Sequence, residues 1–124
     1  MNNTMLINAD DMCFSKGASS AIKELCSIKA INSVSVIVTQ NQFFKDLSWL
    51  KSQSELSIGL HINLTYGPAI LTSCLTTKEG IFKHSFSSLA IKSLWYPSFR
   101  RAIEDEVVAQ YDRIKNNSFE ITHI

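Results

Sequence analysis

Short apolar runs alternate with longer amphipathic stretches along this chain. The apolar runs predict strands over residues 5–9, 34–39, 57–64 and 119–124. Between the first three runs, residues 16–29 and 43–53 carry apolar side chains at helical spacing. Because strands that alternate with helices form parallel βαβ units, we expect an α/β protein built around a small parallel sheet.

The pattern is weaker over residues 69–97, where apolar side chains are scattered among Ser, Thr and Lys. A long connection of this kind in a compact domain usually forms a lid or a substrate wall, or contains short helices. After it, Ser98 is a suitable N-cap for a last helix that ends near Asn117. One face of this helix is apolar, with Phe99, Ile103, Val107, Tyr111 and Ile114. No repeat or linker interrupts the chain, so we expect one domain over residues 1–124.

Composition excludes several classes of protein. Among 124 residues, 12 Lys and Arg balance 11 Asp and Glu, which gives no electrostatic reason to expect nucleic acid or an anionic membrane as a partner. Cys13, Cys26 and Cys74 are widely spaced and form no Cys-x-x-Cys pair, as expected of a reduced intracellular protein. Because the first strand and its aspartates come almost at once, we expect no signal peptide. No apolar run approaches the ~20 residues of a spanning helix. We therefore expect a cytoplasmic protein.

The strongest chemical signal is a pair of acidic residues next to the first strand. Asp10 and Asp11 follow that strand, and His61 lies in the third strand. Functional groups of parallel α/β proteins gather at the carboxyl ends of strands. Two adjacent carboxylates repel each other unless a cation neutralises them. Asp and His side chains from separate strands therefore predict a divalent-cation site.

Each of these residues also has a purely structural interpretation. Asp10 and Asp11 suit the cap of the helix that follows them, and His61 taken alone suits a hydrogen-bonded histidine in the core. His123 fits a supporting role in which it holds a ligand's orientation. His84, in the irregular segment, is expected to be solvated.

Other side chains leave similar alternatives open. Cys13 suits a softer metal ion, or a buried thiol that packs the turn. Tyr66, Trp95 and Tyr96 suit stacking on sugar rings, or positions in the core and at its rim.

Three motifs in register are similar to one family. They are Asn-Ala-Asp-Asp at 8–11, Gly-Leu-His-Ile-Asn-Leu-Thr at 59–65 and Thr-His-Ile at 122–124. Together they resemble the YdjC-like carbohydrate deacetylases, the group that contains chitooligosaccharide deacetylase. The Gly67-Pro68 turn and the pattern Ile103, Glu106, Gln110 on the last helix also fit. The resemblance covers essentially the whole chain but only the first half of a family member. It implies parallel β/α units that form the first half of a distorted β/α (TIM-like) barrel, truncated at the fourth strand.

The resemblance also implies an activity and roles for individual residues. Members remove acetyl groups from N-acetylated sugars with a divalent cation, usually Mg²⁺, with Zn²⁺ as the other option. By position, Asp10 is the general base, and Asp11 and His61 are metal ligands. The remaining histidine ligand of the family lies in an Asp-Ser/Gly-His stretch that directly follows Thr-His-Ile, and so lies past Ile124. His123 matches the histidine before that stretch. Met12-Cys13 stands where Phe-Gly is expected, so the turn that orients Asp11 lacks a glycine.

Two hypotheses of different kinds follow. The leading one is a metal-dependent hydrolase of N-acetylated oligosaccharides, present here as an incomplete fragment that is weakly active or inactive. The alternative is a non-enzymatic truncated product, or a half-barrel that acts only when another chain completes it. Exposed edges of a small sheet invite pairing with a second copy or a complementing chain. A sugar-binding module without metal rests on the aromatic residues alone.

Overall fold

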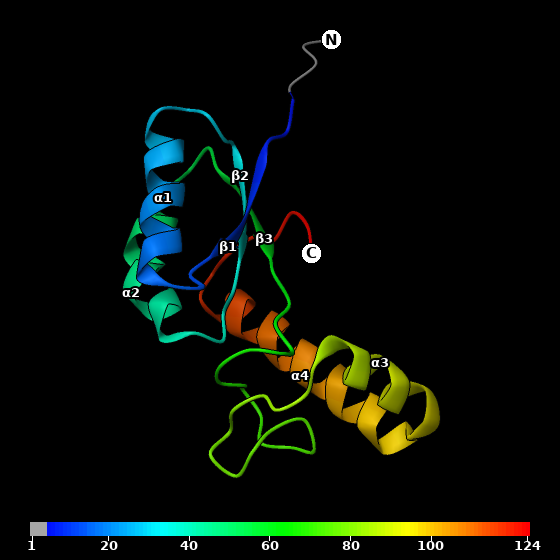
Figure 1. The fold of residues 1–124 in the computed structure, drawn as a ribbon. Coiled ribbons are helices and arrows are strands. Elements are labelled where there is room, and N and C mark those ends of the chain that lie inside the picture. The colour runs from blue at the N-terminus through cyan, green and yellow to red at the C-terminus, as the bar shows by residue number, and fades with distance from the viewer. Residues whose placement is uncertain (1–4) are drawn as a thin grey trace.

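Three parallel strands form the centre of the protein. The computed structural model describes residues 5–124. The strands β1 (Asn8–Met12), β2 (Ser33–Val36) and β3 (Ser57–Leu60) lie in the order β1-β2-β3. Two helices connect them, α1 (Lys16–Ser27) and α2 (Asn41–Lys51), and both lie on one side of the sheet (Figure 1). The predicted α/β fold of parallel β/α units is confirmed.

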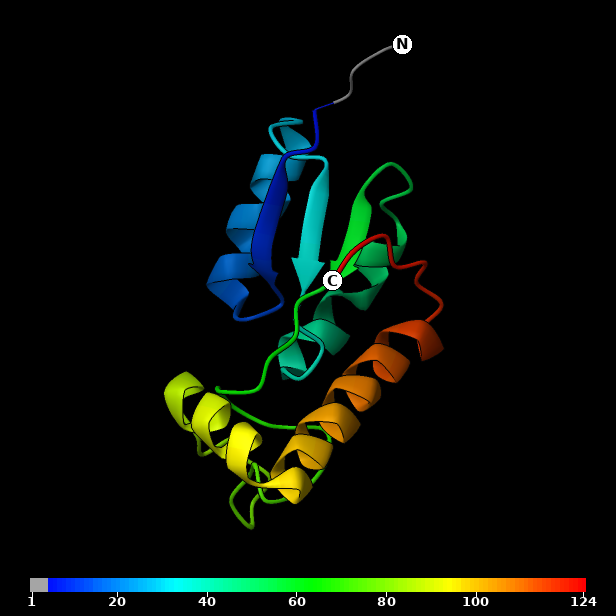
Figure 2. The same ribbon diagram turned by 90° about the vertical axis from the view of Figure 1, so that its right-hand side faces the viewer.

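The second half of the chain adds a helical hairpin. An irregular segment after β3 leads into α3 (Phe86–Trp95), which is followed directly by α4 (Pro97–Asn116). The two helices lie side by side, and α4 leads back toward β3, where residues 117–124 follow the sheet (Figure 2). Within residues 5–124, none of the helices is long and apolar enough to cross a membrane.

Two apolar clusters hold these parts together. The larger lies at the sheet and includes Met12, Val34, Val36, Phe43, Leu50, Leu60 and Ile114. The smaller joins the irregular segment to the hairpin and consists of Leu75, Phe82, Leu89 and Phe99. All four residues of β2 are buried, as expected of the central strand of a parallel sheet.

The strands differ from the predicted ranges. The first strand lies three residues further along, so Asp10 and Asp11 lie within β1 and not after it. Residues 5–7 extend beyond the start of β2 at Ser33, and their side chains are exposed. Strands β2 and β3 end at Val36 and Leu60, earlier than predicted.

The predicted fourth strand is wrong. Residues 119–124 form no regular strand, but they follow the open edge of β3. The Thr122 amide donates to the Ile58 carbonyl (2.9 Å), and the Leu60 amide donates to the His123 carbonyl (3.0 Å). In a regular parallel pair of strands, a single residue of the segment would make both of these bonds, one through its amide and one through its carbonyl. Here Thr122 makes one and His123 makes the other. The segment is nonetheless attached to the sheet.

The helices also begin and end differently from the prediction. Helix α1 ends at Ser27 because Lys29 takes a left-handed φ of 56°, and α2 spans residues 41–51 instead of 43–53. The segment 69–97 contains α3, which Ser85 caps by accepting from the Ser88 amide. Ser98 is not the N-cap of the last helix. Pro97 begins α4, a position that suits its fixed φ and missing N–H.

Candidate functional site

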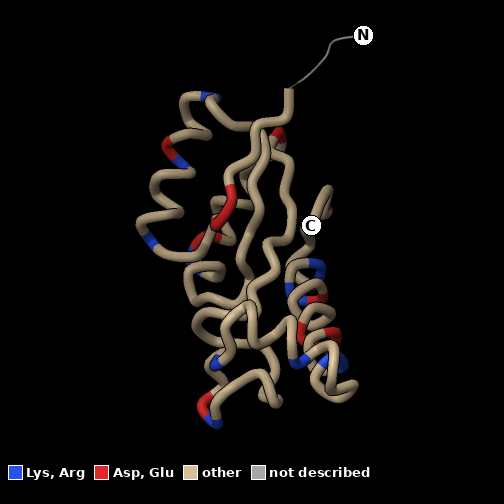
Figure 3. Tube along the Cα trace, turned by 45° about the vertical axis from the view of Figure 1, so that its right-hand side comes forward, with Lys and Arg blue, Asp and Glu red and all other residues tan. Residues whose placement is uncertain are grey.

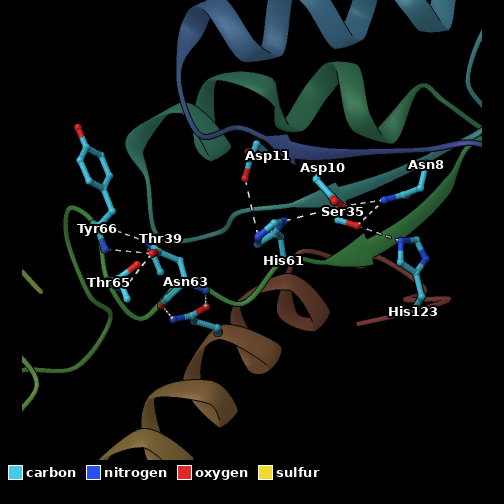
Figure 4. Close-up of polar contacts among 11 residues, drawn as sticks. Asn8, Asp10, Asp11, Ser35, Thr39, His61, Asn63, Thr65, Tyr66 and His123 are labelled. Carbon is cyan, nitrogen blue, oxygen red and sulfur yellow. Dashed lines mark hydrogen bonds and ion pairs between the residues drawn. The ribbon is translucent and has the colours of Figure 1, made fainter. Parts of the chain in front are cut away.

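A bulge in β1 brings the two adjacent aspartates to one side of the sheet. Ala9 pairs with Val34 and Met12 with Val36, so Asp10 and Asp11 together face the single residue between them on β2. Asp11 has a φ of 66°, in the left-handed region. In a regular strand, consecutive side chains point to opposite faces. The bulge removes that alternation, and both carboxylates reach toward His61 (Figure 4).

His61 lies between these two carboxylates. It directly follows β3, and its amide donates to the Val36 carbonyl (2.9 Å), which fixes its backbone to β2. Its Nδ1 is 4.0 Å from Asp10 Oδ1, and its Nε2 is 3.8 Å from Asp11 Oδ1. Each distance exceeds a direct hydrogen bond. The structure therefore brings together all three residues that the sequence singled out.

The capping interpretation of the aspartates is wrong. Ser15 caps α1, because its hydroxyl accepts from the Ala18 amide (3.2 Å). Asp10 and Asp11 also form no ion pair with Lys or Arg within residues 5–124. Strands β2 and β3 contain no charged residue, so these carboxylates are the only charges on the sheet (Figure 3). The ionisable side chain that lies beside both of them is the imidazole of His61.

The turn after Asp11 places a cysteine in a glycine-like conformation. Cys13 has a φ of 70° and is fully buried, at the position where the family resemblance implies glycine. A left-handed φ costs a residue with a Cβ roughly 1–2 kcal/mol. Two contacts hold it: the Cys13 amide donates to Ser19 Oγ (3.3 Å), and its thiol lies 3.7 Å from Asp46 Oδ2. Burial raises the pKa of the Cys13 thiol far above its usual range, and the Asp46 charge adds to this, so the thiol stays protonated and donates. The prediction of a buried packing thiol is confirmed.

Asp46 is a buried charge that sequence reasoning missed. Its carboxylate contacts Lys23 Nζ at 2.5 Å and Gln42 Nε2 at 3.0 Å. Burial acts to raise the pKa of Asp46, but hydrogen bonds led by that from Lys23 outweigh it, so the pKa lies below its ordinary value. Its spacing could have identified it as buried, because Asp46 lies on the same helical face as the buried Phe43 and Leu50.

The C-terminal segment reaches the same region of the sheet. Asn8 Nδ2 donates to Asp10 Oδ1 (2.9 Å) and to Ser35 Oγ (2.9 Å), and His123 Nε2 is 3.3 Å from Ser35 Oγ. A pocket of about 550 Å³ opens beside these side chains. Its lining includes Asn8, Asp10, Ser35, His61, Ile62 and His123.

Helix α4 holds the segment that follows His61. Gln110 donates to the Asn63 carbonyl (2.6 Å) and accepts from the Asn63 amide (3.0 Å). Asn63 donates to Thr39 Oγ1 (2.8 Å) and to the Tyr66 carbonyl (2.7 Å) (Figure 4). Gln110 is fully buried, so these bonds are shielded from water.

The remaining candidates lie elsewhere. His84 is not simply solvated: its Nε2 is 3.1 Å from the Cys74 carbonyl, and its ring packs on Phe99 at 5.2 Å. Trp95, Tyr96 and Tyr66 are exposed, and none of them lines the pocket beside His61. These aromatic residues therefore do not belong to the core.

The donor atoms fit part of a divalent-cation site. An ion held about 2.1 Å from both Asp11 Oδ1 and His61 Nε2 is compatible with atoms 3.8 Å apart. Carboxylate oxygen and imidazole nitrogen are both common ligands. Over residues 5–124, however, no group of three or more His, Cys, Asp or Glu is arranged to hold a metal ion. The described chain thus offers two donors, one fewer than a typical catalytic zinc site.

Comparison with known proteins places the chain in a family. The sequence model of the family described as YdjC-like protein matches residues 4–124. Carbohydrate deacetylase 2 of Listeria innocua is 30% identical over 111 residues, which are 88% of this chain and 43% of that protein. Chitooligosaccharide deacetylase of Klebsiella pneumoniae is 30% identical over 80 residues, which are 64% of this chain and 32% of that protein.

A solved structure shares the fold. A candidate cellobiose-phosphate cleavage protein from Enterococcus faecalis V583 superposes with a TM-score of 0.74 at 21% identity, over 96% of this chain and 46% of its own. The chain thus spans less than half the length of each of these three proteins. Because the family model matches almost every residue, the chain belongs to the YdjC-like protein family.

Proposed function

We propose that this chain supplies the metal-binding and base-bearing part of a carbohydrate deacetylase that acts on N-acetylated sugars. One observation carries the proposal: a bulge directs Asp10 and Asp11 to the two ring nitrogens of His61, with no Lys or Arg to neutralise them within residues 5–124. The names of the relatives support the reaction class, since they are carbohydrate and chitooligosaccharide deacetylases.

The roles of the residues follow from the chemistry of amide hydrolysis. This reaction needs an activated water, a polarised carbonyl and a proton for the leaving amine. A divalent cation, Mg²⁺ or Zn²⁺, would acidify water and polarise the acetyl oxygen when bound. Asp11 Oδ1 and His61 Nε2 would hold it. Asp10, whose carboxylate accepts a hydrogen bond from Asn8 Nδ2 (2.9 Å), would be the general base that accepts the proton of the attacking water, as its place in the family motif implies.

We further propose that residues beyond this chain complete the site. Two protein donors bind a divalent cation less tightly than three, and the longer relatives contain more than twice the aligned length. The residues that complete the site would belong either to the same polypeptide or to a complementing chain. The 124 residues alone are therefore expected to bind metal weakly and to turn over slowly.

Acetate release from N-acetylated chitooligosaccharides tests the reaction. With Mg²⁺ or Zn²⁺ added, we expect slow release by this chain and a rate at least about 100-fold higher when the second half of a longer relative is co-expressed, because general-base catalysis needs a fully held site. Asp10→Asn should abolish the increase. Equal release with and without the second half would contradict incompleteness, and no release under any condition would contradict the reaction.

Calorimetric titration with Zn²⁺ tests the ligands separately. We expect Asp11→Asn and His61→Ala each to weaken binding at least about tenfold, a loss of about 1.4 kcal/mol, because each removes one of two donors. Asp112→Asn, on the exposed surface of α4, is the matched control and should leave binding unchanged. Unchanged affinity in either ligand variant would show that the assignment is wrong.

A further inference from the structure

The side chain of Asn8 has all its polar atoms engaged next to Asp10. Its two Nδ2 hydrogens go to Asp10 Oδ1 and Ser35 Oγ, each at 2.9 Å, and its Oδ1 accepts from Ser33 Oγ at 2.6 Å. An amide with both hydrogens and its oxygen bonded has one orientation, since a flip would place its oxygen against the carboxylate. The Asp10 side chain itself is two-thirds exposed, and within residues 5–124 Asn8 is the only side chain that donates a hydrogen bond to it.

We propose that Asn8 is the positioning residue that aims the Asp10 carboxylate, and that Ser35 and His123 lock Asn8 in that role. The proposal deepens the proposed function and rests on it. Through His123, the C-terminal segment (residues 117–124) thus supports the site, a role that the order of strands and helices does not predict.

In the proposed arrangement the His123 ring carries its hydrogen on Nδ1. Ser35 Oγ accepts from Asn8 and lies 3.3 Å from His123 Nε2, so its own hydrogen can go to that nitrogen when the nitrogen carries none. Thr122 Oγ1 lies 2.6 Å from Ser57 Oγ and 3.2 Å from the Ile58 carbonyl, so its hydrogen can go to either oxygen while it accepts from His123 Nδ1 at 2.8 Å. Hydrogen on Nδ1 satisfies all these contacts, whereas hydrogen on Nε2 leaves the Ser35 hydroxyl without an acceptor among the described residues.

Gly59 provides independent evidence that the ring of His123 has a dedicated place. A Cβ at position 59 would lie 2.3 Å from both Cδ2 and Nε2 of His123. Real Cβ atoms do not approach other atoms this closely, so the ring occupies the space that a side chain on β3 would fill. Hydrogen bonds then continue from His123 to Ser35 on β2 and to Asn8 and Asp10 on β1 (Figure 4).

The proposal predicts a specific kinetic effect. Asn8 forms no hydrogen bond with Asp11 or His61, so its loss should misalign the base and leave the metal donors in place. We expect Asn8→Ala to lower kcat for acetate release at least about tenfold, with KM and Zn²⁺ affinity unchanged, because catalytic groups are sensitive to small displacements. Asn116→Ala, exposed on α4, is the matched control.

Nuclear magnetic resonance tests the positioning without relying on turnover. Nitrogen shifts of His123 should show hydrogen on Nδ1, and Ser35→Ala should move the signals of both the Asn8 amide and the His123 ring. Ser35→Thr keeps the hydroxyl and should restore them, while Gly59→Ala should displace the ring signals. Hydrogen on Nε2, or unmoved signals in Ser35→Ala, would overturn the proposal, as would an unchanged kcat in Asn8→Ala. If the wild type releases no acetate, the proposed function fails, and the resonance data still decide whether Asn8 is held as proposed.

Discussion

Replacing Asp46 with alanine is expected to destabilise the protein by about 3 kcal/mol. Removing one partner of a buried ion pair typically costs about 3–5 kcal/mol. The lower end applies because the Lys23 side chain is 31% exposed and can return to water. Asp46→Ala also removes the acceptor of the Cys13 thiol, which helps to hold the turn after Asp11. Urea unfolding measures the loss, and Asp112→Ala, at an exposed position, should remain within about 0.5 kcal/mol of wild type.

The contribution of Asp46 also has a defined dependence on pH. Its pKa is lower in the folded state than its ordinary value. The carboxylate therefore stabilises the fold above the ordinary carboxyl range, near pH 4, and this stabilisation is lost as pH falls toward the lower folded pKa. We expect the stability of Asp46→Asn to fall less steeply than that of wild type below about pH 4. If the stabilities of wild type and Asp46→Asn fall equally steeply below about pH 4, then Asp46 is not held as an ion in the folded protein.

The order of elements was predictable because each β/α unit is encoded locally. Apolar periodicity identified three strands and two connecting helices, and parallel pairing follows from that alternation. The position of β1 was not predictable in this way. Two adjacent charged residues normally indicate that a segment is not a strand, yet Asp10 and Asp11 lie inside β1. A β-bulge accommodates them, and a bulge forms only through pairing with another strand, here β2, which the sequence of β1 does not reveal.

The site could be predicted only in part for a similar physical reason. Asp10, Asp11 and His61 follow from the rule that functional groups gather where parallel strands end. The link from His123 to Asn8 crosses three segments that are distant in sequence, and it depends on the missing side chain of Gly59. Short-range patterns contain no signal for such contacts. The same holds for residues 119–124, whose apolar pattern suits a strand although only two backbone bonds attach them to β3.

Helix α4 contains the other buried charge with a large expected effect. Glu106 is almost fully buried, and its two carboxylate oxygens accept from the Ile70 amide (3.0 Å) and the Leu71 amide (2.9 Å). Gln110 Nε2 also donates to Glu106 (2.9 Å) while it holds Asn63, two residues after His61. Glu106 therefore connects the irregular segment after β3 to the helix that supports the site.

Glu106→Ala is expected to destabilise the protein by about 3 kcal/mol. The substitution leaves two partly buried backbone amides without their acceptor, and an unpaired donor costs about 1–3 kcal/mol where it is buried. Glu104→Ala is the matched control, because Glu104 is exposed on the same helix and should change stability by less than about 0.5 kcal/mol. Urea unfolding measures the difference, and hydrogen exchange locates it: the amides of Ile70 and Leu71 should exchange faster in Glu106→Ala and remain as in wild type in Glu104→Ala. If these two amides stay protected without Glu106, the carboxylate is not what anchors this segment to α4.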